Sequence, residues 1–210
     1  MTLHQLGFKN HTDKADPGHS FNGKSYLYWY EKYMEDFKDK AVPVLEIGVF
    51  NGNSLRTWQD YFTQAKIYGI DIEDKKVHDT ARIKTFRGDQ ADEAFLESVI
   101  KETGRPSVIV DDGSHINHLT LKSFNYLFKH LAPGGVYIIE DLLCSYHPNI
   151  QNEIVHWPGM DKVVALGHQM HNDRKLIDDF LLDMIKTLDK RSGEIEFVHS
   201  HAMFMVIKKI

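Results

Sequence analysis

The 210-residue sequence has little cysteine and no long hydrophobic run. Its one cysteine, Cys144, excludes an internal disulfide framework and is typical of proteins kept in a reducing compartment. No apolar segment approaches the roughly 20 residues that a membrane-spanning helix needs. The N-terminus lacks the basic stretch and following apolar stretch of a secretory signal. We therefore expect a cytoplasmic protein that does not enter the membrane.

An excess of basic charge is also missing. The chain has 25 Lys and Arg against 30 Asp and Glu, a formal net charge of −5, which argues against binding to nucleic acid. The hydrophobic fraction of 42% and charged fraction of 26% are ordinary for a globular protein. At this length we predict one domain, residues 1–210, with one sizeable core.

What the sequence does have is a regular alternation of apolar and amphipathic segments. Strands are expected at 42–48, 67–71, 82–86, 108–111 and 136–139, with helical patterns between most of them and again at 176–188. Such alternation predicts a parallel, doubly wound α/β sheet. Segments 195–197 and 202–207, separated by a short turn, predict an antiparallel hairpin at the C-terminus.

Two regions fall outside this alternation. Within residues 1–40, the polar, turn-rich stretch 6–23 predicts a loop, and the aromatic spacing over 26–37 predicts a helix that packs on the domain. We expect this N-terminal part to lie over the ligand side, and Tyr26, Trp29 and Tyr30 to be packing aromatics. Residues 142–172 predict a long irregular excursion, and excursions of that length are usually functional.

Two of the predicted strands end in acidic residues. Segment 108–110 runs into Asp111-Asp112-Gly113-Ser114-His115, and segment 136–139 into Glu140-Asp141. The carboxyl ends of parallel strands meet at one edge of a sheet, where ligands bind. Carboxylates beside an imidazole favour an oxygen-ligand metal site next to a general base. The alternative for Asp112 is the capping of a turn, since Asp-Gly-Ser is ordinary turn chemistry.

A glycine-containing loop, Glu46-x-Gly48-x-x-x-Gly52, follows the first strand of the alternation. It lacks the middle glycine of the dinucleotide fingerprint, with Phe50 in its place, which counts against a pyrophosphate. An acidic residue just before the loop favours a cationic ligand. Asp71, at the end of the next strand, is placed to accept hydrogen bonds from ribose hydroxyls.

Together these motifs resemble the class I S-adenosylmethionine-dependent methyltransferases. Gly69-Ile70-Asp71-Ile72 and Gly88-Asp89-Gln90 belong to the same resemblance. Asp111 to His115, Leu131-x-Pro133-Gly134-Gly135 and Tyr137 to Leu142 resemble, more narrowly, the metal-dependent sugar O-methyltransferases of macrolide antibiotic biosynthesis and the related rhamnosyl O-methyltransferase or cephalosporin hydroxylase group. The resemblance extends from about Asn10, where Asn10-His11-Thr12-Asp13-Lys14 is similar to an N-terminal family segment, to Ile210.

The resemblance implies a Rossmann-like seven-stranded sheet completed by the C-terminal hairpin. It implies an O-methyltransferase that uses S-adenosylmethionine and Mg²⁺ and acts on a sugar hydroxyl of a glycosylated natural product or polysaccharide. The implied metal ligands are Asp112, Glu140 and Asp141, and the implied catalytic residues are His115, as general base, and Asp112. The implied cofactor residues are Glu46, Gly48, Asp71, Asp89 and Gln90, and we also predict cofactor contacts at Asn51, Gly52, Ser54, Ile72 and Asp111.

Several alternatives stay open at this point. The chain departs from the family at Leu143 to Pro148, and we expect it to lack the extra N-terminal domain of the macrolide enzymes. A catechol-like or other small hydroxylated acceptor is therefore the nearest alternative. A cofactor-binding domain without transferase activity is another, and a homo-oligomer is compatible with the sequence. Asp111 either lines the methionine end of the cofactor or anchors its loop. The pairs His168 and His171, and His199 and His201, lack partners at a zinc spacing.

Overall fold

The computed structural model describes residues 1–146 and 153–210. Its α-helices are α1 (Leu3–Lys9), α2 (Tyr26–Met34), α3 (Asn53–Tyr61), α4 (Glu93–Thr103), α5 (Asn117–His130), α7 (Met160–Ala165) and α8 (Arg174–Asp189). Its strands are β1 (Ser20–Phe21), β2 (Lys24–Ser25), β3 (Pro43–Ile47), β4 (Lys66–Asp71), β5 (Ile83–Arg87), β6 (Val108–Asp111), β7 (Val136–Ile139), β8 (Ile195–Ser200) and β9 (Met205–Lys209).

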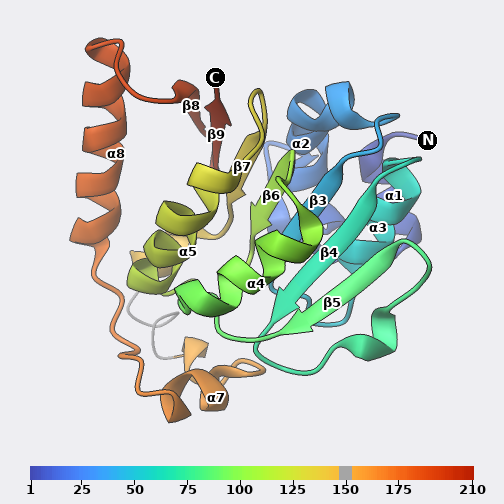
Figure 1. Ribbon diagram of the computed structural model, residues 1–210, viewed down its shortest axis with the longest axis horizontal. Helices are drawn as coiled ribbons and strands as arrows, with labels where there is room; N and C mark the ends of the chain where they lie inside the picture. The colour runs from blue at the N-terminus through green and yellow to red at the C-terminus, as the bar shows by residue number, and fades with distance from the viewer. Residues whose placement is uncertain (147–152) are drawn as a thin grey trace.

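The main sheet has seven strands in the order β5-β4-β3-β6-β7-β9-β8 (Figure 1). The first five strands are parallel, and β9 pairs antiparallel with both β7 and β8. The predicted doubly wound sheet and C-terminal hairpin are therefore confirmed. The chain runs outward from β3 to β5 and then returns to place β6 on the other side of β3. This reversal creates a switch point between β3 and β6, where open α/β sheets bind ligands.

Helices cover both faces of the sheet. One core cluster joins α1, α2 and α3 to the sheet, and a second joins α4, α5 and α8 to its opposite face. The central strands β6 and β7 are buried along their length. Because both faces of these strands are covered, their apolar residues are continuous rather than alternating. This packing fixes the carboxyl ends of β3, β6 and β7 as one rigid edge.

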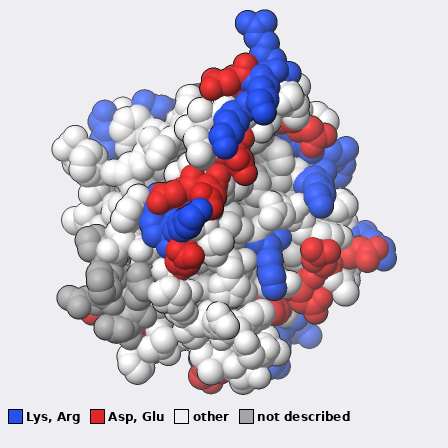
Figure 2. Space-filling model, turned by 90° about the vertical axis from the view of Figure 1, so that its left-hand side faces the viewer, with Lys and Arg blue, Asp and Glu red and all other residues white. Residues whose placement is uncertain are grey.

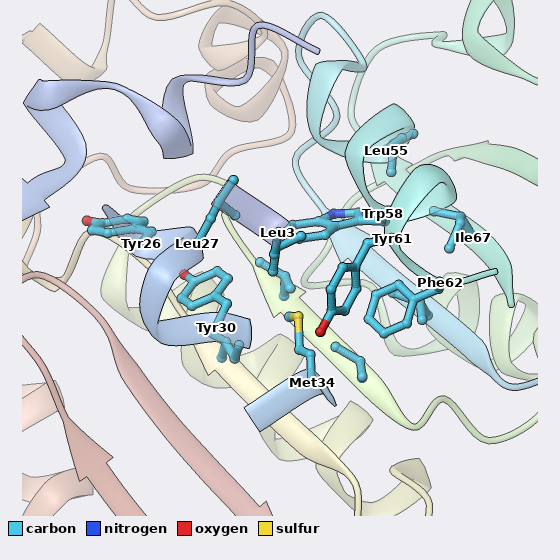
Figure 3. Close-up of a cluster of buried hydrophobic side chains, with 14 of the residues drawn as sticks. Leu3, Tyr26, Leu27, Tyr30, Met34, Leu55, Trp58, Tyr61, Phe62 and Ile67 are labelled. Carbon is cyan, nitrogen blue, oxygen red and sulfur yellow. The ribbon is translucent and has the colours of Figure 1, made fainter. Parts of the chain in front are cut away.

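The first residues of the chain do not form the loop that the sequence predicts over 6–23. Residues 3–9 form α1, which begins with a capping box in which the Thr2 hydroxyl accepts from the Gln5 backbone N–H. Leu3 is fully buried in the cluster that Figure 3 shows, with Tyr26, Tyr30, Met34 and Trp58. The N-terminal part is thus anchored by aromatic packing, as predicted for the helix that follows it.

Other differences from the predicted elements are local. The helix expected over 26–37 ends as α2 at Met34 and continues as a 3₁₀ turn, Glu35–Phe37. The last strand begins at Met205 rather than at residue 202, because Met203 takes a left-handed backbone conformation with a φ of 76°. The excursion at 142–172 contains the 3₁₀ turn Leu142–Ser145 and helix α7. Its residues 147–152, with Pro148, lie outside the described residues.

The surface carries charges of both signs. Figure 2 looks onto the side where α8 lies and shows acidic and basic side chains interspersed along one column. Three ion pairs on α8 link residues three or four apart: Arg174 with Asp178, Lys175 with Asp179, and Lys186 with Asp183. In the described part of the chain, no helix is long and apolar enough to cross a membrane.

Candidate active site

A cleft opens at the switch point between β3 and β6. Five of the predicted cofactor residues line it: Gly48, Asp71, Ile72, Asp89 and Gln90. Helix α7 closes the opposite side with Met160 and Val163. The excursion, left without a specific role by the sequence, therefore forms one wall of this cleft.

Gly48 allows the loops after β3 and β6 to meet at the cleft. Its φ is 87°, a left-handed conformation that favours glycine. A Cβ on Gly48 would stand 1.9 Å from the backbone oxygen of Asp112. The glycine is therefore required because two loops approach each other closely at this point. They are the loop after β3, residues 48–52, and the loop after β6, residues 112–116 (the acidic loop).

Asp71 combines a structural and a ligand-facing position. Its Oδ2 accepts from the backbone N–H groups of Val49 and Phe50, at 3.0 and 3.1 Å. Its Oδ1 accepts from the backbone N–H of Glu73 at 2.8 Å. Asp71 thus holds the turn after β3 while it lines the cleft.

The other five predicted cofactor residues are not among the described residues that line this cleft: Glu46, Asn51, Gly52, Ser54 and Asp111. Glu46 is fully buried and accepts a 2.7 Å hydrogen bond from the Ser54 hydroxyl. Gly52 precedes α3, where a Cβ would meet the ring of His78. The hydrogen bond between Glu46 and Ser54 therefore links the end of β3 to the start of α3.

Asp111 anchors the acidic loop, which was one of the two roles left open for it. Its carboxylate accepts from the hydroxyls of Ser123 and Tyr137, at 2.8 and 2.9 Å. Burial raises the pKa of Asp111 to about 6, although these two hydrogen bonds lower it. Gln90 extends the anchor, because its side-chain oxygen accepts from the backbone N–H of Ser114 at 2.8 Å.

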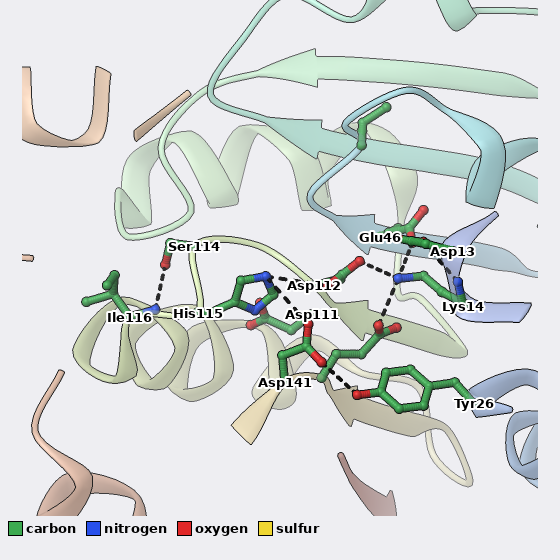
Figure 4. A network of polar contacts seen from close by, with 12 residues as sticks. Asp13, Lys14, Tyr26, Glu46, Asp111, Asp112, Ser114, His115, Ile116 and Asp141 are labelled. Carbon is green, nitrogen blue, oxygen red and sulfur yellow. Dashed lines mark hydrogen bonds and ion pairs between the residues drawn. The ribbon is translucent and has the colours of Figure 1, made fainter. Parts of the chain in front are cut away.

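The residues that follow Asp111 converge with those that follow β7 (Figure 4). Ligand atoms of Asp112, His115 and Asp141 all lie within 4.8 Å of one another. His115 Nε2 is 3.7 Å from Asp112 Oδ1 and 4.0 Å from Asp141 Oδ2. Both His115 and Asp141 have a φ of 54°, a strained conformation for residues with a side chain and one that collects at functional sites.

Lys14 is a charged residue of the site that sequence reasoning missed. Its side chain is 2% exposed, and its ammonium bonds to Asp112 Oδ2 and to Glu140 Oε2, the latter at 2.8 Å, and lies 3.7 Å from Glu46 Oε1. Burial alone would lower the pKa of Lys14, but the three carboxylates raise it well above its usual range. Lys14 belongs to the family-like segment Asn10 to Lys14, and that resemblance was the only signal for it.

Glu140 lies deeper than the other two predicted metal ligands. Its side chain is 1% exposed, against 21% for Asp112 and 15% for Asp141. Burial and repulsion from Asp112 raise the pKa of Glu140 well above its usual range, although Lys14 opposes both effects. Burial likewise raises the pKa of Asp112. Burial is thus the main reason that both carboxyl groups favour the protonated form.

The residues present fit a hard divalent cation. Asp112 and Asp141 offer carboxylate oxygens, Glu140 Oε1 is buried without a hydrogen-bond partner among the described residues, and three carboxylates share the one ammonium of Lys14. Mg²⁺ prefers oxygen ligands, so His115 is better suited to proton transfer than to coordination. Among the described residues, Asp112, His115 and Asp141 form the one group of three such side chains with this spacing.

The excursion supplies three more residues that the sequence did not single out for the site. The Asn172 side chain donates to the His115 carbonyl and accepts from the backbone N–H of Asn117, both at 2.7 Å. Trp157 packs edge-on against the His115 ring at 5.4 Å. His168 contacts Asp89 at 2.6 Å beside the cleft. His199 and His201 instead share the Tyr33 hydroxyl, away from the acidic cluster.

This geometry can be compared with that of known proteins. A scan against models of protein families finds no match. The full chain superposes on the MycE methyltransferase of the mycinamycin biosynthetic pathway, solved with Mg, S-adenosylhomocysteine and mycinamycin VI, with a TM-score of 0.77, 30% identity and coverage of 54% of that chain. The chain has the class I methyltransferase fold. A Podospora anserina methyltransferase with bound S-adenosylhomocysteine matches with 15% identity and a TM-score of 0.55, over 100% of this chain and 88% of that protein. This second likeness shows the fold alone.

Sequence relatives are sugar O-methyltransferases. The mycinamicin VI 2''-O-methyltransferase of Micromonospora griseorubida is 42% identical over 134 residues, 59% of this chain and 34% of that protein. The demethylmacrocin O-methyltransferase of Streptomyces fradiae is 38% identical over 152 residues, 67% of this chain and 38% of that protein. The chain spans little more than a third of the length of these relatives and about half of MycE.

Proposed function

We propose that this chain is an S-adenosylmethionine- and Mg²⁺-dependent O-methyltransferase that acts on a sugar hydroxyl of a glycosylated natural product or polysaccharide. The observation that carries the proposal is the placement of the Asp112, His115 and Asp141 cluster directly beside the switch-point cleft. Gly48, Asp71, Gly113, Pro158 and Met160 line both this cleft and the neighbouring cavity that contains the cluster. A methyl donor and a hydroxyl acceptor bound in the two cavities would meet at that shared wall.

Gly48, Asp71, Ile72, Asp89 and Gln90 would hold the cofactor in the cleft. The carboxylate of Asp71 is placed for ribose hydroxyls, and Asp89, which also lines the cleft, contacts His168 at 2.6 Å. When bound, the cofactor supplies a sulfonium methyl group, and Mg²⁺, held by Asp112, Asp141 and Glu140, lowers the pKa of a hydroxyl and fixes its direction. These assignments follow the sequence predictions for the five cleft residues and the three acidic residues.

The chain's own contribution to chemistry is orientation and proton removal. His115 Nε2 faces the two carboxylates, and Trp157 and the Asn172 bond to its carbonyl fix the ring and backbone. With S-adenosylmethionine bound as methyl donor and its sulfur as leaving group, His115 Nε2 would take the proton of the acceptor hydroxyl. Positioning of the reacting atoms supplies much of the rate enhancement in such a displacement.

The relatives support the acceptor class. Mycinamicin VI and demethylmacrocin methyltransferases are named for glycosylated macrolides, and an L-olivosyl-oleandolide 3-O-methyltransferase of Streptomyces antibioticus is 35% identical over 153 residues. The cavity beside the cluster is lined by Phe50, Trp157 and His19, which suit the apolar faces of a sugar ring. The substrates for which the relatives are named favour a sugar over a catechol-like acceptor.

Two measurements test the proposal. Calorimetric titration of the chain with S-adenosylhomocysteine should show one site per chain, and absence of binding overturns the methyltransferase function. Transfer of labelled methyl from S-adenosylmethionine to a panel of glycosides and catechols should proceed with Mg²⁺ and stop with EDTA. Turnover that EDTA leaves unchanged overturns the metal assignment, and transfer to catechols alone overturns the sugar assignment.

A further inference from the structure

Tyr26, the first residue of α2, contacts the acidic cluster, which consists of Asp112, His115 and Asp141. Its hydroxyl donates a 2.6 Å hydrogen bond to Asp141 Oδ1 (Figure 4). A hydroxyl-to-carboxylate bond of this length is charge-assisted and stronger than a neutral one. Sequence position gave no sign of this contact, because 115 residues separate the two partners.

Packing on several sides fixes the orientation of the Tyr26 ring and of its hydroxyl. The side chain is 1% exposed, and it packs against His19 at 5.3 Å and Phe204 at 5.0 Å, with Tyr30 stacked at 6.0 Å. The Ser25 hydroxyl accepts from Tyr28 at the start of α2 and so fixes the helix end that carries Tyr26. The Tyr26 hydroxyl is therefore preorganised to donate its hydrogen bond to Asp141.

Asp141 presents its two oxygens to different partners. Oδ1 accepts from Tyr26, and Oδ2 faces the cluster, 4.0 Å from His115 Nε2. The Asp141 carboxylate has no other side-chain hydrogen bond among the described residues. Without the Tyr26 bond, rotation about its Cβ–Cγ bond can therefore turn either oxygen toward the cavity. The phenol selects one orientation.

Asp112 shows the same division of oxygens. Its Oδ2 bonds to Lys14 and its Oδ1 lies 3.7 Å from His115 Nε2. Lys14 and Tyr26 both belong to the N-terminal part of the chain, before the first strand of the main sheet. This part therefore binds one oxygen of each carboxylate, Asp112 Oδ2 and Asp141 Oδ1. The other oxygen of each lies within 4.0 Å of His115 Nε2.

We infer that Tyr26 is a positioning residue for the metal site, acting through Asp141. The inference rests on the proposed function, because it assigns a role toward the divalent cation of that function. Hydrogen bonds to the ligands of a metal ion orient those ligands, and their loss typically costs about 10–100-fold in metal affinity. Tyr26 is not among the described residues that line the cleft assigned to the cofactor, so we expect cofactor binding to be independent of it.

The test uses Tyr26→Phe, which keeps the ring and its packing and removes only the donor. Mn²⁺, followed by calorimetry or by the loss of free-ion paramagnetic signal, reports metal binding without turnover. We expect Mn²⁺ affinity to fall about 10–100-fold, with S-adenosylhomocysteine affinity unchanged. In turnover assays the Mg²⁺ concentration for half-maximal rate should rise by the same factor, while kcat at saturating Mg²⁺ stays near the wild-type value.

Tyr28→Phe is the matched control, because Tyr28 lies on the same helix and is 40% exposed. It should leave both affinities unchanged. Asp141→Asn completes a double-mutant cycle: in that background Tyr26→Phe should weaken Mn²⁺ binding no further, since the residue acts only through the carboxylate.

The outcomes separate the two claims. If wild-type protein binds neither S-adenosylhomocysteine nor Mn²⁺, the proposed function fails. If wild-type protein binds both and Tyr26→Phe binds Mn²⁺ equally well, the positioning role alone is overturned. A Tyr26→Phe protein that loses affinity for both ligands to the same degree, or that fails to fold, also overturns it, because the hydroxyl would then serve the fold and not the metal.

Discussion

At the scale of single residues, the site depends on side chains held in unusual states. His115 and Asp141 take left-handed backbone conformations, Lys14 is a buried ammonium, and Glu46 is a fully buried carboxyl group. Each of these states costs free energy that the surrounding structure must offset. Substitutions that remove one functional group and keep the backbone conformation therefore separate chemistry from stability.

The first such substitution is His115→Asn. Asparagine tolerates the left-handed conformation at this position but cannot take a proton at neutral pH. We expect kcat for methyl transfer to fall about 10²–10⁴-fold, the usual contribution of a general base, with S-adenosylhomocysteine binding retained. His130→Asn, at the far end of α5, is the control. A His115→Asn enzyme with wild-type kcat would remove the base assignment.

Lys14→Met tests the buried ammonium. The substitution leaves Asp112, Glu140 and Glu46 without their shared cation, and breaking a buried ion pair costs about 3–5 kcal/mol of unfolding free energy. A divalent cation that binds the native state should recover more stability in the variant than in the wild type. Urea unfolding with and without Mg²⁺ measures both effects, and Lys9→Met, which removes an exposed partner of Asp60, is the control.

Glu46→Gln tests pH dependence. Burial raises the pKa of Glu46 from an ordinary 4.5 to about 7, against the opposing effect of Lys14. The folded state then binds more protons than the unfolded state between these values, so the contribution of Glu46 to stability falls as pH rises through that window, by about 3 kcal/mol. Unfolding free energies measured from pH 4.5 to 8 should decline more steeply for the wild type than for Glu46→Gln. Parallel curves would show that Glu46 titrates normally.

At the scale of elements, loops that follow different strands are locked to one another. The turn after β3 meets the turn after β6 at Gly48, the Gln90 side chain binds the turn after β6, and Asn172 binds the start of α5. The acidic loop is thus held from three sides by segments that are distant in the sequence. Its geometry depends on each contact.

Gly48→Ala should disturb this arrangement most. A Cβ would fall 1.9 Å from the Asp112 backbone oxygen, and the φ of 87° is unfavourable for alanine. We expect a loss of about 2–4 kcal/mol in unfolding free energy, together with weaker binding of S-adenosylhomocysteine. Gly18→Ala, where a Cβ meets nothing within 4 Å, should stay within about 0.5 kcal/mol of the wild type. Equal stability of the two variants in urea would contradict the close approach.

At the scale of the whole molecule, topology brings the cleft and the acidic cluster to one edge. The sheet reverses between β3 and β6, and the N-terminal part, packed through its aromatic cluster, reaches the same edge with Lys14 and Tyr26. Ligand binding at such a central position should stabilise the entire fold, because it engages both halves of the sheet.

S-adenosylhomocysteine at about 100 times its Kd should add about 2.7 kcal/mol of stability. For a chain of this size each kcal/mol raises Tm by about 2–4 °C, so we expect a rise of about 5–10 °C in a thermal melt. NAD⁺ should give no rise, because the loop after β3 has Phe50 where the dinucleotide fingerprint needs glycine. A rise with NAD⁺ and none with S-adenosylhomocysteine would contradict the cofactor assignment.

The sequence by itself determined the order of elements, the parallel sheet with its C-terminal hairpin, and the acidic ends of β6 and β7. These features depend on local periodicity and on the apolar runs of buried strands, which are readable along the chain. The proximity of Asp112, His115 and Asp141 also followed from strand ends that share one edge.

Only the tertiary structure decided which oxygens face the cavity and what holds them. Lys14, Tyr26 and Asn172 reach the site from 98, 115 and 57 residues away, to Asp112, Asp141 and His115 respectively. It also shows that Asp111 and Glu46, which we predict as cofactor contacts, are buried and accept hydrogen bonds from the hydroxyls of Ser123 and Ser54. Side-chain hydrogen bonds between distant segments leave no periodic signal, because they depend on how helices and loops pack on the finished sheet.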